Sequence, residues 1–219
     1  MKHSYYGPYE KYIKRPLDCF LSLIAIVLLS PVLLIVTILV RVNLGSPVLF
    51  KQKRTGLNEK EFSILKFRTM TDQKDEKGNL MPDEVRLTSF GKKLRATSLD
   101  ELPSLFNIFK GDMSIIGPRP LPIKYVPYYT EEEHHRHDVR PGLTGLAQVN
   151  GRNYVTWEDK FRMDLEYASH ITFLTDIRIL FKTVAVVLKH DNIDTGSFIE
   201  KDGVIYRPLN VERGEKNEN

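Results

Sequence analysis

The chain is poor in cysteine: only one of its 219 residues, Cys19, is a cysteine. A single cysteine cannot form an internal disulfide, which excludes a small secreted disulfide scaffold and favours a reducing compartment. The sequence also lacks an internal repeat and the patterns G-x-G-x-x-G and G-x-x-x-x-G-K-[ST]. The glycine-rich phosphate loops of dinucleotide-binding and P-loop proteins are therefore excluded.

No charge of one sign is in large excess, since 32 Lys and Arg face 28 Asp and Glu, for a net charge of +4. With 42% hydrophobic and 27% charged residues, the composition is ordinary for a globular protein and names no class. The mild basicity suits a partner that carries phosphates, such as a lipid headgroup, a nucleotide or a nucleic acid, and it fits simple solubility equally well. The length fits one domain, or one domain plus an anchor.

What the sequence does contain is a run of 22 residues without a charge, from Cys19 to Val40. This length passes the usual threshold for a membrane helix. The apolar core of a signal peptide is shorter, and no small-residue cleavage pattern follows the run, so a signal peptide is not predicted.

The apolar run is broken near its middle by Ser30-Pro31. Proline has no N–H for the carbonyl of Val27, its ring collides with that carbonyl, and the residue before it is pushed away from helical angles. The Ser30 hydroxyl is available to neighbouring backbone groups. Each half of about 11 residues spans roughly 17 Å, about half of a ~30 Å hydrocarbon core. Three interpretations stay open: a re-entrant hairpin that enters one leaflet, a kinked span, and a buried core helix.

Cationic residues flank the run on both sides, so they give no inside/outside asymmetry of the kind typical of a span. They are Lys11, Lys14 and Arg15 before it and Arg41, Lys51, Lys53 and Arg54 after it.

Beyond the run, hydrophobic patterns predict two short strands and several helices. They are strands at 48–50 and 62–68 and helices over 89–111, interrupted at Pro103, over 131–138 and over 173–189. Lys66 and Arg68 are predicted on one face of the second strand. The broad apolar face of the last helix fits packing against the core or a position in the membrane interface. From Val211 onward the chain is polar, and we expect it to be disordered.

The most informative charged stretch is RATSLDELP, residues 95–103. Ser98-x-x-Glu101 fits a helix capping box, in which the two side chains satisfy backbone donors. Pro103 would fall past the first turn of such a helix, and a helix that starts one residue before it tolerates the proline better. Asp100 and Glu101 would then lie at a helix N-terminus. The pattern therefore leaves open a capping box or a catalytic dyad.

Two adjacent carboxylates repel each other unless a cation lies beside them, and Mg²⁺ is the natural candidate because it favours carboxylates together with substrate phosphates. Arg119 stands between two prolines, so its backbone is fixed before any ligand arrives, which suits a bidentate grip on phosphate. Further cations near the dyad are Lys92, Lys93, Arg95 and Lys110.

Five segments follow one another in a distinctive order: KFRTM at 66–70, RATSLDELP at 95–103, FNIFKGDM at 106–113, GPRP at 117–120 and RPGLTGLAQVNGR at 140–152. Together they resemble the bacterial sugar transferase family, the monotopic phosphoglycosyl transferases. The resemblance runs from about Arg15 to about residue 194. Leu146 departs from it, because many relatives have Gly-Trp-Ala-Gln there.

The resemblance implies a mainly helical α+β fold in which the Ser30-Pro31 break turns the membrane helix back into one leaflet. The implied organisation is a polar lead-in at 1–16, a re-entrant membrane hairpin at 17–42, a cytoplasmic catalytic domain at 43–200 with short strands and amphipathic interfacial helices, and a partly disordered tail at 201–219.

The resemblance also implies site residues. Asp100 is expected to be the nucleophile, and Asp100 and Glu101 are expected to bind Mg²⁺. Arg95 and Arg119 are expected to bind phosphate or nucleotide. Lys66 and Arg68 are further substrate-binding candidates.

The implied activity is transfer of a sugar-1-phosphate from a UDP-sugar to polyprenol (undecaprenyl) phosphate with release of UMP, through an aspartyl-phosphosugar intermediate. This would be the first membrane step of surface glycan assembly, on the cytoplasmic face of the bacterial inner membrane, with downstream glycosyltransferases as candidate partners. The alternative is a non-catalytic module that docks on membranes and binds anionic lipids. A nucleic-acid partner is not expected, because a soluble nucleic-acid-binding protein does not need such an apolar run.

A cluster at His134, His135, Arg136 and His137 invites a metal-site interpretation, with Glu131 and Glu133 nearby. We interpret it instead as a solvated polar face.

Overall fold

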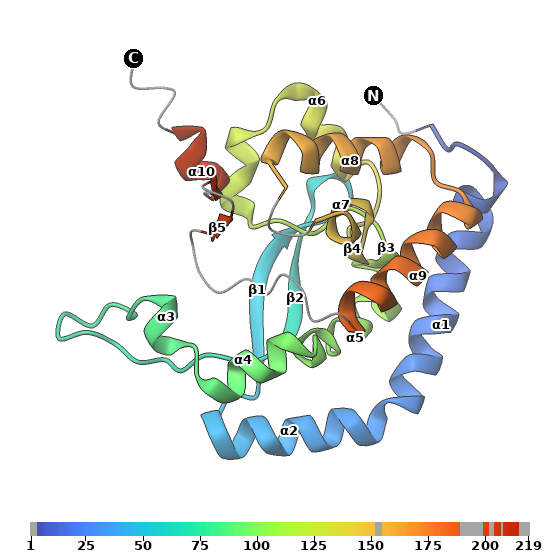
Figure 1. Ribbon diagram of the computed structural model, residues 1–219. Coiled ribbons are helices and arrows are strands. Elements are labelled where there is room, and N and C mark those ends of the chain that lie inside the picture. The colour runs from blue at the N-terminus through green and yellow to red at the C-terminus, as the bar shows by residue number, and fades with distance from the viewer. Residues whose placement is uncertain (1–3, 152–154, 189–198, 202–203, 207, 215–219) are drawn as a thin grey trace.

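A computed structural model describes residues 4–151, 155–188, 199–201, 204–206 and 208–214 (Figure 1). Within these residues the chain is mainly helical, and its strands form three two-stranded sheets. The predicted α+β class, mainly helical, is therefore confirmed.

The apolar run forms two helices with a break between them. A π-helical turn, η1 (Tyr9–Ile13), leads into α1 (Lys14–Leu28), and α2 (Ser30–Leu44) follows at a bend of 63°. Ser30 Oγ donates to the carbonyl of Val27 at 2.8 Å, the carbonyl that Pro31 leaves without its helical partner. Among the described helices none is long and apolar enough to cross a bilayer alone, although this bent pair reaches that length and composition together. The break is confirmed, and the re-entrant topology stays a prediction.

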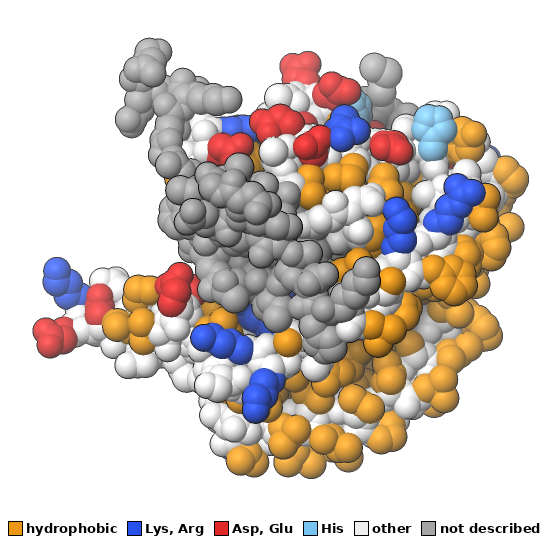
Figure 2. Space-filling view, viewed as in Figure 1, with side chains coloured by type: hydrophobic (Ala, Val, Ile, Leu, Met, Phe, Trp, Pro, Cys, Tyr) orange, Lys and Arg blue, Asp and Glu red, His pale blue; other side chains and the backbone are white. Residues whose placement is uncertain are grey.

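Both ends of this bent pair pack on the rest of the protein. The inner face of α2 buries Val36, Val40 and Leu44 against Phe67 and Leu94. Its outer face, together with that of α1, exposes apolar side chains, which gather along the lower edge in Figure 2.

Polar contacts secure the start of α1. The Arg15 guanidinium donates to the carbonyls of Ile108 and Phe109 at 2.7 and 2.9 Å. Asp18 accepts from Ser114 Oγ at 2.5 Å, and Lys14 pairs with Asp176 at 2.6 Å. Because buried polar groups need partners, these contacts fix α1 in place.

The two predicted strands form an antiparallel hairpin, longer than expected, from β1 (Leu49–Thr55) and β2 (Glu61–Phe67), joined by η2 (Leu57–Glu59). The helical pattern over 89–111 divides into α4 (Ser89–Ala96), η3 (Leu99–Glu101) and α5 (Ser104–Lys110), after a short α3 (Asp83–Arg86).

The predicted capping box at Ser98 and Glu101 does not form. Ser98 has a left-handed backbone, with φ of 55°, and its side chain makes no capping hydrogen bond. Thr88 caps α4 instead, by accepting from the backbone N–H of Gly91. The left-handed Ser98 ends α4 and turns the chain into η3.

The second half of the chain surrounds a short parallel pair of strands, β3 (Ser114–Ile116) and β4 (Gly142–Thr144). A Cβ on Gly117 would lie 2.3 Å from the carbonyl oxygen of Arg140, so this close approach requires glycine. The remaining elements are η4 (Ile123–Tyr128), α6 (Glu131–His134), η5 (His135–His137), α7 (Leu146–Val149), α8 (Trp157–Ser169), α9 (Phe173–Leu188), β5 (Ile199–Lys201), β6 (Val204–Tyr206) and α10 (Leu209–Glu212).

The interpretation of residues 134–137 as a solvated polar face is wrong for two of them. Arg136 and His137 are both buried. The Arg136 guanidinium pairs with Asp164 of α8 at 2.6 Å, so its charge has a partner in the interior. His134 and His135 pair with Glu59 and Asp138 near the surface. Across the described ranges, no group of three or more His, Cys, Asp or Glu side chains is placed to hold a metal ion.

Part of the predicted C-terminal tail is folded. Leu209 of α10 is fully buried in a cluster with Tyr125, Tyr129 and Phe161. Arg213 donates to both carboxylate oxygens of Glu133, at 2.6 and 2.7 Å. Residues 208–214 are ordered by this apolar anchor and ion pair, and residues 215–219 lie outside the described residues.

Candidate active site

The predicted dyad lies in η3, between α4 and α5. Asp100 is buried, with 8% of its surface exposed, and the Glu101 side chain is 23% exposed. η3 is a short turn between two helices that also packs against β2, so the backbone of both residues is held at the β1–β2 hairpin.

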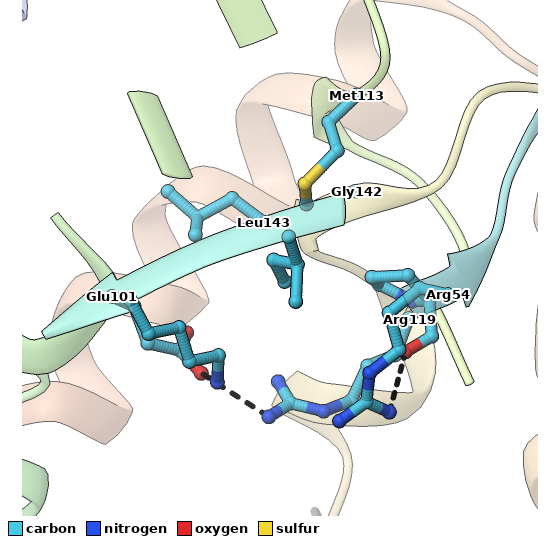
Figure 3. Close-up of a pocket in the computed structure, with 9 residues that line it drawn as sticks. Arg54, Glu101, Met113, Arg119, Gly142 and Leu143 are labelled. Atoms are coloured by element: carbon cyan, nitrogen blue, oxygen red, sulfur yellow. Dashed lines mark hydrogen bonds and ion pairs between the residues drawn. The ribbon is translucent and has the colours of Figure 1, made fainter. Parts of the chain in front are cut away.

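Two cations converge on one oxygen of Glu101. Lys66 Nζ lies 2.5 Å and Arg119 Nη2 lies 3.1 Å from Glu101 Oε1, as Figure 3 shows for the arginine. Burial alone would raise the pKa of Glu101, but the charges and hydrogen bonds of Lys66 and Arg119 outweigh it and lower that pKa to about 2. Glu101 is therefore ionised and paired at neutral pH.

Asp100 shows the opposite behaviour. Burial, and then the neighbouring Glu101 charge, raise the pKa of Asp100 to about 6, against the opposing effect of Lys66, Arg95 and Arg119. The carboxylate is therefore largely ionised at neutral pH, at a cost that comes mainly from burial. A buried carboxylate on which the charges of Lys66, Arg95 and Arg119 act is a candidate nucleophile.

The position of Lys66 relative to the dyad is set by contacts between α5 and β2. Ser104 Oγ donates to the carbonyl of Leu65 at 2.8 Å. Asn107 accepts from the Leu65 N–H at 3.0 Å and donates to the carbonyl of Ser63 at 2.9 Å. These buried contacts fix the strand that carries Lys66 against the helix that follows Glu101.

The loop that carries Arg119 is held from behind by Arg136, which the sequence did not identify as part of the site. Arg136 Nη2 donates to the carbonyl of Arg119 at 2.8 Å. Its Nε and Nη2 also donate to Asp164, so a buried ion pair fixes this backbone together with Pro118 and Pro120.

A further arginine, predicted from the sequence only as a charge that flanks the apolar run, lines a pocket together with Lys66, Glu101 and Arg119. Arg54, on β1, lies beside Arg119 in the pocket shown in Figure 3. Burial, and then the Arg119 charge, lower the pKa of Arg54 to about 10. The pairing of β1 with residues 121–122, through Thr55 N–H to the Leu121 carbonyl at 3.2 Å, brings these arginines together.

The other predicted site residues divide between two places. Arg95 donates to Thr69 Oγ1 at 3.1 Å, and its charge acts on Asp100. Arg68 does not join the cluster. Its guanidinium is buried at the end of α2, where it donates to backbone carbonyls and pairs with Asp72 at 3.4 Å. The structure therefore brings Lys66, Asp100, Glu101, Arg95 and Arg119 together and leaves Arg68 outside.

The dyad fits a divalent cation only in part. Two adjacent carboxylates suit Mg²⁺, which takes its other ligands from phosphates and water. A cation beside Asp100 would also offset the burial and the Glu101 charge that raise the pKa of Asp100. The described part of the chain places no third acidic or histidine ligand beside the two carboxylates. Asp100 and Glu101 would therefore hold the ion together with substrate oxygens.

Comparison with known proteins gives concordant matches. A family described as bacterial sugar transferase matches residues 9–190. A Bacillus subtilis protein described as uncharacterized sugar transferase EpsL is 49% identical over 181 residues, covering 83% of this chain and 90% of the relative.

Two longer relatives carry more specific names. The UDP-N-acetylgalactosamine-undecaprenyl-phosphate N-acetylgalactosaminephosphotransferase of Aeromonas hydrophila is 37% identical, covering 83% of this chain and 45% of the relative. The UDP-glucose:undecaprenyl-phosphate glucose-1-phosphate transferase of Klebsiella pneumoniae is 38% identical, covering 78% of this chain and 39% of the relative. The chain thus spans less than half the length of these two.

Proposed function

The chain belongs to the bacterial sugar transferase family, and from that premise we propose that it transfers a sugar-1-phosphate from a UDP-sugar to polyprenol phosphate, releasing UMP. The names of the Aeromonas and Klebsiella relatives support this substrate class. The observation that carries the proposal is the dyad itself, in which Glu101 is paired with two cations while the adjacent Asp100 is buried and has a raised pKa.

In the first step, a carboxylate oxygen of Asp100 bonds to the β-phosphorus of the donor. The bond between that phosphorus and the bridging oxygen breaks, and UMP leaves with the electron pair. Arg119 and Lys66 neutralise charge on the phosphate oxygens, and Arg95 adds positive charge near Asp100. Mg²⁺, held by Asp100 and Glu101, would supply further neutralisation of the phosphates.

In the second step, an oxygen of the polyprenol phosphate attacks the same phosphorus and the bond to Asp100 breaks. The carboxylate is restored and the sugar is left on the lipid through a diphosphate. The two displacements predict ping-pong kinetics. Glu101 keeps Lys66 and Arg119 in place through both steps.

A lipid acceptor requires the dyad to lie close to a membrane surface, and the exposed apolar side chains support that position. Phe106 and Phe109 are exposed on α5, the helix that begins just after Glu101. Figure 2 shows that apolar side chains also gather over α1, α2 and α9. Helices with one exposed apolar face suit the boundary between headgroups and acyl chains.

The contacts of α1 and α2 favour the re-entrant form over a span. Lys14, Arg15 and Asp18, at the start of α1, contact the same domain that buries Val40 and Leu44, at the end of α2. A spanning helix would place one of these ends across the membrane from that domain. We therefore propose a monotopic protein on the cytoplasmic face of the inner membrane.

The leaving nucleotide tests this function. Detergent-solubilised protein, incubated with Mg²⁺, undecaprenyl phosphate and a panel of UDP-sugars, is expected to release UMP and to form lipid-linked sugar. Asp100→Asn is expected to abolish both products, whereas Asp83→Asn, at an exposed carboxylate of α3, is expected to keep wild-type turnover.

The alternative, a non-catalytic module that binds anionic lipids, predicts vesicle binding without UMP release for every UDP-sugar. Release of UDP instead of UMP would contradict the proposed reaction as well, because it indicates ordinary glycosyl transfer.

A further inference from the structure

The pocket beside Glu101 contains more positive charge than its carboxylates balance. Arg54, Lys66 and Arg119 line it with Glu101. Glu101 already accepts from both Lys66 and Arg119, and it is the one acidic residue of this lining. Arg54 therefore adds a cation for which the pocket lining provides no carboxylate.

Arg54 also has a donor that nothing in the described protein uses. Its Nη1 donates to the Pro120 carbonyl at 3.1 Å, and its Nη2 donates to Gln52 Oε1 at 2.5 Å. Its Nε is buried, and no atom of the described residues accepts a hydrogen bond from it. A buried donor without an acceptor is costly, and such groups in native proteins call for an explanation.

The two guanidinium groups lie on the same side of the pocket in Figure 3. Their mutual repulsion contributes to the lowered pKa of Arg54. An anion placed against both guanidinium groups would offset this repulsion. Planar guanidinium groups match the oxygens of phosphate, and neighbouring arginines are a common way to bind one.

The backbone around Arg54 is fixed in advance. Arg54 pairs with Pro122 across a single β-bridge, and its strand is held in the hairpin by seven residue pairs from Leu49–Phe67 to Thr55–Glu61. The cavity volume of the pocket is about 10 Å³, close to the smallest space that admits one water-sized group. It therefore has room for an oxygen of a phosphate group rather than for a base or a sugar.

We propose that Arg54 is a substrate-binding residue, which with Arg119 forms a two-arginine seat for a phosphate group. This inference rests on the proposed function, which supplies two substrates with such a group: the nucleotide donor and the lipid phosphate acceptor. The shared ligand chemistry is a phosphate oxygen, and the test below separates the two sources.

The test compares Arg54→Gln and Arg54→Lys with Lys53→Gln. Lys53 is the neighbouring residue of β1, but its side chain is 73% exposed and pairs with Glu61 at the surface. The Gln variants of Arg54 and Lys53 each remove one positive charge, so general electrostatics change equally. Arg54→Lys keeps the charge and loses the Nε–H and the planar fork.

Binding is measured first, with inorganic phosphate and with UMP as probes, by calorimetric titration and by the rise in melting temperature that each probe causes. Arg54→Gln is expected to weaken binding of at least one probe by about ten- to hundredfold, as for loss of charge-assisted hydrogen bonds, and Arg54→Lys by about tenfold. Lys53→Gln is expected to stay within about twofold of wild type.

Kinetics then identify the source of the phosphate. In a ping-pong reaction, a fall in kcat/KM for the UDP-sugar alone assigns the seat to the donor, and a fall for undecaprenyl phosphate alone assigns it to the acceptor. If Arg54→Lys, which keeps a cation beside Pro120, binds both probes and turns over both substrates within twofold of wild type, the inference is overturned.

Failure of the inference can be told apart from failure of the proposed function. If wild type makes no lipid-linked sugar from any UDP-sugar, the proposed function fails, while the phosphate titrations still test the arginine seat. If wild type is active and the Arg54 variants match it in binding and turnover, only the inference fails.

Discussion

Asp100 and Glu101 are neighbours in the chain, yet their surroundings drive their pKa values in opposite directions. The pKa of Glu101 is lowered to about 2 because two cations overcome its burial, and the pKa of Asp100 is raised to about 6 because burial and its neighbour's charge prevail. Pairs of acids with separated pKa values commonly divide a chemical task. Here the ionised Glu101 pairs with Lys66 and Arg119, and under the proposed function Asp100 is the acid that reacts.

The raised pKa of Asp100 predicts that its ionised form costs stability. A carboxyl whose pKa in the folded protein exceeds its value of 3.8 in the unfolded chain loses stability as the pH rises from about 4 through 6. Asp100→Asn removes this cost, and we expect it to raise the free energy of unfolding by about 1–3 kcal/mol at pH 7.5 while turnover is lost. Chemical denaturation at pH 7.5 and at pH 4 measures the effect.

The stabilisation is expected to disappear at pH 4, where Asp100 is protonated in the folded protein and resembles asparagine. Asp83→Asn is the control, because Asp83 is exposed and pairs with Arg86 at the surface. A stabilisation that is equal at both pH values would show that Asp100 titrates as an ordinary carboxylate.

Among the elements, the contact between η5 and α8 fixes the loop that carries Arg119. Arg136 and Asp164 are almost fully buried, with side chains 1% and 5% exposed, and Arg136 also holds the carbonyl of Arg119. Removing one partner of a buried ion pair leaves a charge without compensation, which costs about 3–5 kcal/mol. We therefore expect Asp164→Asn to lower the free energy of unfolding by that amount, measured by urea denaturation.

The same helix provides a matched control. Arg162 pairs with Asp159 at 2.8 Å, and both side chains are exposed on α8. Arg162→Gln is expected to change stability by less than about 1 kcal/mol, because surface ion pairs contribute little. Equal losses in the two variants would contradict a special role for the buried pair.

The sequence predicted elements better than it predicted their partners. The proline at 31, the proline at 103 and the strand patterns act over a few residues, so the break, the divided helix and the two strands could be predicted, although the pairing of the strands was not. Arg136 and Asp164 are 28 positions apart. Their pairing depends on how η5 packs on α8, and no local pattern encodes it, so Arg136 and His137 were wrongly interpreted as part of a solvated face.

The same reasoning applies to the site. The adjacency of Asp100 and Glu101 left a capping box and a catalytic dyad open, and the resemblance to the sugar transferase family favoured the dyad. Arg54 was not predicted as a site residue, because a cation on a strand has no distinctive pattern until the hairpin and residues 120–122 place it beside Arg119. Lys66 and Arg68 show the limit of strand periodicity: β2 ends at Phe67, and Arg68 turns toward α2 instead of the pocket.

At the scale of the whole molecule, the exposed apolar surface predicts where the protein meets the membrane. Val184 of α9 and Val85 of α3 are 52% and 51% exposed, but Val184 shares its helix with the exposed Phe181 and Leu188. Val184→Asp is expected to weaken partition into phospholipid vesicles by about tenfold or more, because the interface then takes up a charge. Val85→Asp is expected to partition as wild type does, and sedimentation with vesicles measures both. Equal weakening would place the contact elsewhere.

The bent pair α1–α2 makes a prediction about topology that only the whole molecule can test. Both ends of the pair contact one domain, so residues before α1 and after α2 should lie on the same side of the bilayer. In a Cys19→Ser background, single cysteines at Lys11 and Lys51 report each end, since these positions are exposed in η1 and β1. In sealed inverted vesicles, a membrane-impermeant maleimide is expected to label both cysteines without detergent, because a half-depth hairpin returns the chain to the side it entered from. Labelling of one cysteine only, with the other requiring detergent, would establish a kinked span. The contacts that Lys14, Arg15 and Asp18 of α1 make with the domain would then be absent from the membrane-bound protein.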